Sequence, residues 1–176
     1  MKTRLLLVFT FLIFLVACET EQTFIDVSEA DLVGTWNLTK QSVEDGSFTV
    51  SAQGQTLTAD YSASTKNIDF RFTFSKDPNK LNLDGTYTLT TTASFLGQTE
   101  TDEQNIDTNL LPMQPVDWTV NGNSLYFTNS QDLPAILNIT EFSGNYIKLE
   151  GDFNETETYN GDSVTIVGKI IIELTK

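Results

Sequence analysis

The sequence lacks the residues on which most protein chemistry depends. It contains no histidine and one cysteine in 176 residues. Histidine-ligated metal sites, Ser-His-Asp and Cys-His catalytic groups, and disulfides within the chain are therefore excluded. We predict that the protein is not an enzyme, with no catalytic residues, no cofactor and no metal.

Basic residues are also scarce. Lys and Arg number 10 against 24 Asp and Glu, which gives a net charge of -14, and the only arginines are Arg4 and Arg71. A field of this sign repels phosphate backbones. We therefore predict no nucleic-acid partner.

No apolar run is long enough to span a bilayer as a helix. The longest, from Leu5 to Ala17, has 13 residues where about 20 are needed, and Lys2 and Arg4 precede it. A basic start followed by a short apolar stretch is typical of a secretory signal. Residues 1–17 are predicted to be a cleaved signal peptide.

The single cysteine follows that stretch directly. The segment "LVAC", from Leu15 to Cys18, resembles the lipobox of bacterial lipoproteins. The resemblance implies that the chain is cut before Cys18, that Cys18 is lipidated, and that the lipid anchors the protein to a membrane. The alternative is a chance cysteine in a signal or a membrane-anchored helix.

Residues 18–30 then form a predicted flexible acidic tether behind the anchor. Glu19, at the position after the cysteine, is similar to lipoproteins released to the outer membrane, and Glu19-Thr20-Glu21 resembles the surface-export signal of Bacteroidota lipoproteins. The predicted localisation is the outer membrane, facing the periplasm or the cell surface.

From Gly34 onward, apolar residues alternate with polar ones. In "NIDFRFTF", Ile68, Phe70, Phe72 and Phe74 share one face, as expected of a half-buried antiparallel strand. The segment "KLNLDGTYTLT" continues the pattern after a turn at Pro78. The two segments predict one long hairpin.

Three further segments predict strands. Asn121-Gly122 predicts a two-residue hairpin turn that places Trp118 opposite Leu125. A second hairpin is expected around residues 143–145, and the last strand, with apolar residues in phase, carries Gly168 at an expected bulge or bend. In all, roughly eight to ten short strands predict an all-β sandwich or barrel.

One stretch breaks the alternation. Residues 96–115 run from a polar, acidic segment into "LLPMQP". An insertion of this length between strands is unusual. We predict a flexible lid or a disordered loop.

The start of the first strand carries a family resemblance. Gly34-Thr35-Trp36 looks like the G-x-W motif of lipocalins, and residues 31–176 resemble the lipocalin-like lipoproteins of Bacteroidota. The resemblance implies an antiparallel up-and-down β-barrel with Trp36 packed structurally in its closed floor. Lipocalins usually place a late Arg across this tryptophan; here Lys169 or Lys176 would have to replace it.

Several side chains could carry chemistry. Asp152, Asn154, Glu155 and Asp162 offer oxygen ligands for calcium, but without the spacing of a calcium loop, so a solvated hairpin is favoured. The acid pairs Asp102/Glu103 and Glu155/Glu157 could suggest glycoside hydrolysis, although adjacent acids on polar loops more often serve solubility. Trp118 could stack on a sugar, but its phase with Leu125 favours core packing.

Two functions follow from these patterns. The first is an outer-membrane-anchored lipocalin-like lipoprotein that binds a small apolar or amphipathic molecule, because a small barrel can hold one ligand unless its own side chains fill it. The alternative is a non-enzymatic structural or accessory envelope module that docks a protein or glycan partner.

Overall fold

The computed structural model describes residues 25–52, 54–110, 115–128, 135–159 and 162–176. Its elements are α2 (Glu29–Leu32), β1 (Gly34–Ala52), β2 (Gln55–Ser75), β3 (Lys80–Phe95), β4 (Gln98–Asp107), β5 (Val116–Asn121), β6 (Ser124–Thr128), β7 (Ile136–Phe142), β8 (Tyr146–Tyr159) and β9 (Asp162–Thr175). In the described part of the chain, no helix has the length and apolar character needed to cross a membrane.

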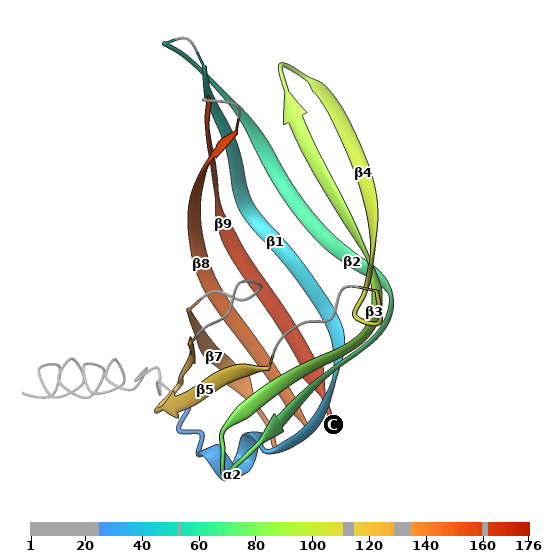
Figure 1. Cartoon of the computed structure of the whole chain (residues 1–176), viewed down its shortest axis with the longest axis vertical. Coiled ribbons are helices and arrows are strands. Elements are labelled where there is room, and N and C mark those ends of the chain that lie inside the picture. Colours follow the sequence, from blue (N-terminus) through green and yellow to red (C-terminus); the bar gives the residue numbers. More distant parts are fainter. Residues whose placement is uncertain (1–24, 53, 111–114, 129–134, 160–161) are drawn as a thin grey trace, which may run out of the picture.

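The nine strands form one antiparallel sheet that closes on itself (Figure 1). Each strand pairs with its neighbour in sequence, except that β4 pairs only with β3, and β5 continues the ring from β3. The ring closes where β1 pairs with both β2 and β9. The predicted all-β, up-and-down barrel is confirmed.

The hydrophobic core fills one end of this barrel. The predicted phenylalanine face of β2 is buried there, since Phe70, Phe72 and Phe74 are at most 4% exposed. Phe74 meets Trp118 edge to face, with the ring centroids 5.3 Å apart. Each buried Phe contributes ~1.5 to 3 kcal/mol to folding. The other members of the hydrophobic core cluster lie at the same end, which therefore holds most of the apolar burial.

Trp36 lies in the floor of the closed end. Its ring is fully buried, and its indole N–H donates a hydrogen bond to the backbone oxygen of Leu32, in α2, at 2.7 Å. The Lys176 ammonium lies 4.4 Å from the ring centroid, a cation–π distance. Lys176 is therefore the lysine that lies across the tryptophan, while Lys169 pairs with Glu150 on the barrel's outer face.

The prediction of a lid or disordered loop over residues 96–115 is wrong for most of that stretch. Leu96 and Gly97 form a two-residue turn with φ angles of 50° and 79°, and β4 then pairs with β3 from Gln98 to Asp107. β4 is an edge strand that pairs only with β3; apart from Ile106 it is polar on both faces and shows no apolar alternation. Residues 111–114 lie outside the described residues.

Two details of register also differ from prediction. Trp118 pairs with Phe127, not Leu125, because the turn lies at Gly122 and Asn123. The two-residue shift leaves the same side chains on the inner face. The expected bulge at Gly168 lies instead on the neighbouring strand, between Glu44 and Ser47 of β1.

Candidate functional site

The barrel is closed only over the length of the short strands β5, β6 and β7. Beyond them, the other six strands continue as an open sheet. β5, β6 and β7 have only 6, 5 and 7 residues, whereas β1 has 19 and β2 has 21. The remaining sheet, in the order β4-β3-β2-β1-β9-β8, is curved, and its two sides stand apart in Figure 1. We call this region the distal half (residues 46–65, 89–105 and 152–168) and its concave face the trough.

Apolar residues form the floor of the trough. Phe48 of β1 pairs with Ala59 of β2 and Ile166 of β9, and Val50 of β1 pairs with Leu57 and Val164. Paired residues share a face, and Ile166 is in phase with the buried Ile170 of the same strand. The floor is therefore the outward continuation of the core surface.

Unlike the core, this floor is accessible. Leu57 is 58% exposed and Phe95 is 40% exposed, whereas core residues such as Leu81 and Leu125 are fully buried. Tyr61, farther along the same face of β2, is half-buried, and this burial raises the pKa of its hydroxyl. An apolar surface that stays open to solvent on one face is typical of a binding site.

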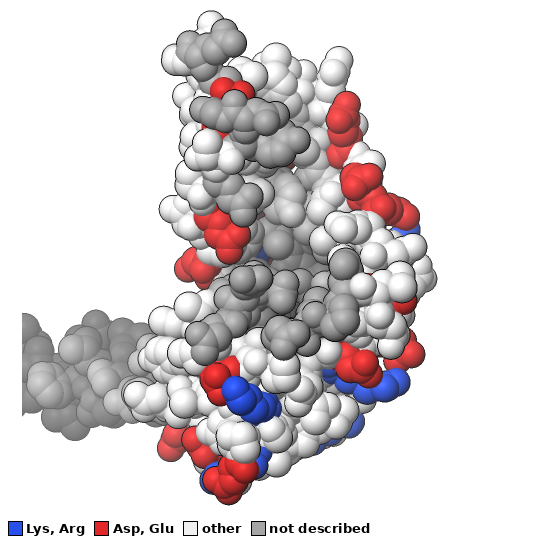
Figure 2. All heavy atoms as spheres, viewed as in Figure 1, with Lys and Arg blue, Asp and Glu red and all other residues white. Residues whose placement is uncertain are grey.

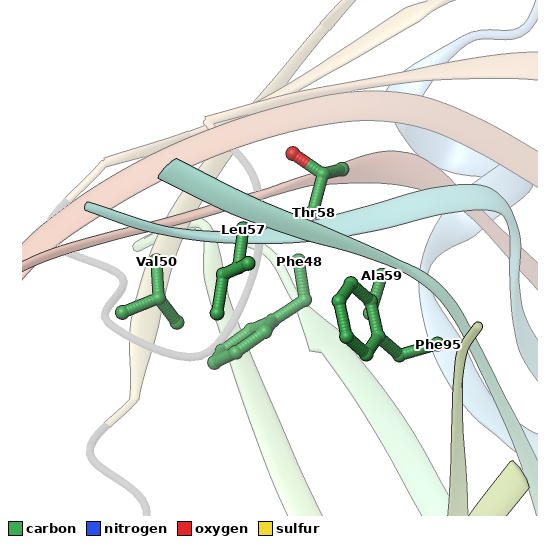
Figure 3. A pocket seen from close by; sticks show the side chains of 6 residues that line it. All are labelled: Phe48, Val50, Leu57, Thr58, Ala59 and Phe95. Carbon is green, nitrogen blue, oxygen red and sulfur yellow. The ribbon is translucent and has the colours of Figure 1, made fainter. Parts of the chain in front are cut away.

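A pocket of about 180 Å³ lies in this floor. It is lined by Phe48, Val50, Leu57, Thr58, Ala59 and Phe95 (Figure 3). Thr58 points to the other side of the strands in this view, where its hydroxyl lies 3.0 Å from that of Thr49. Drug-sized ligands occupy roughly 300 to 1,000 Å³, so the pocket suits one part of a molecule that extends along the trough.

The glycine predicted to mark a bulge shapes the inner end of the trough. A Cβ at Gly168 would come within 2.9 Å of Val43 and 3.1 Å of the Phe153 ring. The missing side chain therefore lets Phe153, its partner on β8, lie across the sheet. This contact joins the trough floor to the closed core.

The convex face of the distal half is covered by hydroxyl groups. Pairs of Ser and Thr hydroxyls on neighbouring strands lie 2.9 to 3.4 Å apart: Thr49/Thr58, Ser51/Thr56, Thr156/Thr165, Ser94/Thr99 and Thr92/Thr101. Strand alternation thus gives this sheet a hydroxyl-rich outer face and an apolar inner face.

Charge is distributed unevenly between the two halves of the molecule. The distal half contains eight acidic residues and no Lys or Arg in its sequence: Asp60, Glu100, Asp102, Glu103, Asp152, Glu155, Glu157 and Asp162. Figure 2 shows acidic side chains along the β4 side of this half, and basic ones mainly around the closed end.

Among the acids of the outer strands β4 and β8 whose side chains the structure describes, three belong to the concave face. Glu100 and Asp102 of β4 pair with Ala93 and Thr91 of β3, and Glu155 of β8 pairs with Ile166. Since Ala93 pairs with Tyr61, all three carboxylates lie on the trough side, on the two outermost strands. We call Glu100, Asp102 and Glu155 the rim acids.

The strongest electrostatic cluster lies outside the trough. Glu150 of β8 accepts hydrogen bonds from Lys169 and Lys148, and these lower its pKa to about 2. Glu141 also pairs with Lys148. With its side chain only 16% exposed, Glu150 ties β7, β8 and β9 together and contributes to the barrel wall.

The structure separates most residues considered for chemistry. Asp152 and Asn154 alternate with Glu155 and so lie on the opposite face of β8. Asp102 and Glu103 likewise lie on opposite faces of β4, and Glu103 forms an ion pair with Lys66. Among the described residues, no three acidic side chains gather closely enough to hold a metal ion.

The remaining predicted residues have structural positions or fall outside the description. Gly34, with φ of 121°, and Trp36 lie at the closed end. Trp118 is 1% exposed and packs on Phe74, which confirms core packing over sugar stacking. Cys18 and the side chain of Glu157 lie outside the described residues.

Sequence reasoning missed the floor of the trough. Its signal was present in "SFTVSA" and "QTLTADY", where Phe48 and Val50, and Leu57 and Ala59, alternate with Ser and Thr. What the pattern could not reveal was that β5, β6 and β7 stop short of these residues and leave them accessible.

The comparisons with known proteins returned no match, whether to a family model, to a curated protein or to a solved structure.

Proposed function

We propose that the protein is a membrane-anchored binding protein that holds a small apolar or amphipathic molecule in the trough. The observation that carries this proposal is the accessible apolar floor, formed by Phe48, Val50, Leu57 and Phe95, on a sheet whose other face is covered by hydroxyls. The proposed activity is binding, not catalysis.

The closed end supports this role by stabilising the open one. The strands of the trough, apart from the edge strand β4, enter the core at the closed end, where Trp36, Trp118 and the β2 phenylalanines are packed. A preformed site loses little conformational entropy on binding. The floor can therefore stay apolar and exposed without collapsing.

Lipidation of Cys18 completes the proposal. The lipobox resemblance, the acidic segment behind it and the lipocalin-like barrel together support an outer-membrane lipoprotein whose trough receives molecules near a membrane. The predicted tether over residues 18–30 is wrong for its last part, because Val27 is buried in the core and α2 begins at Glu29. The six residues from Glu19 to Phe24 can extend over at most roughly 20 Å, which keeps the domain close to the bilayer.

Substitution of the floor tests the binding site. Leu57→Ser should weaken or abolish the thermal stabilisation and native-mass adducts that envelope lipid extracts produce with the unsubstituted protein, because Leu57 lines the pocket. Ile136→Ser is the matched control, since Ile136 of β7 is also exposed, at 47%, but lies away from the pocket.

Two results would contradict the proposal. One is the absence of any stabilising or co-purifying small molecule. The other is equal ligand binding by the Leu57→Ser and Ile136→Ser proteins, which would show that the bound molecule does not contact the trough floor.

A further inference from the structure

We propose that the trough selects amphiphiles with a cationic head group over neutral or anionic ones of the same chain length. This inference rests on the proposed function, because it names the class of molecule that the trough would hold. It is carried by the juxtaposition of the apolar floor with the rim acids Glu100, Asp102 and Glu155.

The first step is the position of the rim acids relative to the floor. Strand register aligns Glu155, Ile166, Phe48 and Ala59 across β8, β9, β1 and β2. On the other side, Tyr61, Ala93 and Glu100 align across β2, β3 and β4. Both rows therefore consist of uncharged side chains in the middle of the sheet. The first row ends in a carboxylate on β8, and the second row ends in a carboxylate on β4.

The second step is the absence of a compensating charge. Of the Lys and Arg residues that the structure describes, none forms an ion pair with Glu100, Asp102 or Glu155. Lys66 and Lys169, which directly follow two segments of the distal half, pair with Glu103 and Glu150 instead. The rim is thus left with negative charge facing the trough.

The third step is the match to a ligand. An alkyl or aromatic chain on the floor would bury Phe48, Leu57 and Phe95 at ~25 cal/mol per Å². Its head group would then lie near one of the two acidic rims, where a cation is attracted and a carboxylate is repelled. An amphiphile with a neutral head group would keep the apolar contribution of the floor and would gain nothing from the charge of the rims.

The experiment compares three ten-carbon amphiphiles: decyltrimethylammonium, decyl glucoside and decanoate. Each is titrated below its critical micelle concentration into the full chain carrying Cys18→Ala, so that no protein-bound acyl chain competes for the trough. Calorimetry should give a dissociation constant for the cation roughly tenfold below that of decanoate, the sum of several exposed charge contacts. Raising the salt concentration to about 1 M should remove this preference, because the screening length falls to ~3 Å.

Two triple variants separate rim charge from overall charge. Glu100→Gln, Asp102→Asn and Glu155→Gln together should remove most of the preference but leave decyl glucoside binding unchanged. The matched control neutralises three acids of the distal half that lie on the convex face, with Asp60→Asn, Glu103→Gln and Asp152→Asn. It should keep most of the preference.

The outcomes distinguish this inference from the proposed function. Binding of all three amphiphiles with similar dissociation constants, or equal loss of preference in both triple variants, would overturn the cation selectivity alone. Binding of none of them would overturn the trough as a site for amphiphiles, and the selectivity with it.

Discussion

At the scale of single residues, Glu150 shows how an acidic protein can use one carboxylate to stabilise its wall. Its side chain lies between Lys148 and Lys169 on the outer face, and its pKa is lowered to about 2 from 4.5 by their hydrogen bonds. A depressed folded-state pKa contributes stability that is present above pH ~4.5 and lost as the pH falls through the folded value.

Glu150→Gln should therefore reduce the free energy of unfolding at pH 7, by about 1 kcal/mol because solvent screens the partly exposed lysine partners. The difference from the unsubstituted protein should shrink as the pH is lowered from 5 toward 2. Urea unfolding across this range measures it. A gap that stays constant with pH would mean that the ion pairs do not lower the pKa of Glu150.

Single residues also mark what could be predicted from sequence. Phe70, Phe72 and Phe74 were placed correctly because each lies on a strand with one buried face. Lys176 could be named only as one of two candidates, since its position over Trp36 depends on where the last strand ends relative to the first. Pairings this distant in sequence leave no local pattern.

At the scale of elements, β4 was the strand that the sequence concealed. Apart from Ile106 it is polar, with Glu100, Asp102 and Glu103 among its residues, because its only partner is β3. Charged residues on an edge strand also discourage pairing with a second chain. The features that hide β4 from pattern recognition are those that an edge strand requires.

Hydrogen exchange tests the β4 assignment. The β4 amides bonded to β3 should exchange more slowly than expected for a disordered chain, because they donate to backbone carbonyls. Thr92→Pro, which removes a β3 amide between two paired strands, should speed exchange in β4. Exchange of residues 98–107 at the rate of an unstructured peptide would contradict the strand.

Element lengths explain why the trough itself was not predicted. The sequence shows apolar alternation in most of the strands that line it, including the alternation of Phe48 and Val50 with hydroxyl residues. The opening arises because β5, β6 and β7 are short, and length differences between distant strands become meaningful only once their register is known. Two-residue shifts, such as that at Trp118, leave the pattern unchanged.

At the scale of the whole molecule, the two ends have different compositions. The closed end contains the tryptophans and most of the basic residues, and the distal half is apolar inside, hydroxyl-rich outside and acidic at its rim (Figure 2). Such a division suits a protein in which one end provides stability and the other meets a ligand.

The proposed anchor predicts where the whole molecule is found. Cys18→Ala should abolish incorporation of labelled fatty acid and move the protein from the membrane fraction to the soluble one, because a lipid attached at Cys18 is the proposed anchor. Glu19→Gln serves as the control and should keep the label. Retention of both label and membrane association by Cys18→Ala would contradict the lipobox.

The central claim, that the trough is the binding site, is tested most directly with a spin-labelled amphiphile. A decyltrimethylammonium analogue with a nitroxide on its chain broadens nearby methyl signals in nuclear magnetic resonance spectra. We expect broadening at Val50, Leu57, Val164 and Ile166, and none at Leu81, Leu125 or Leu137 in the closed core. Bound ligand that broadens the core methyl groups, or leaves those of the trough unchanged, would contradict the account.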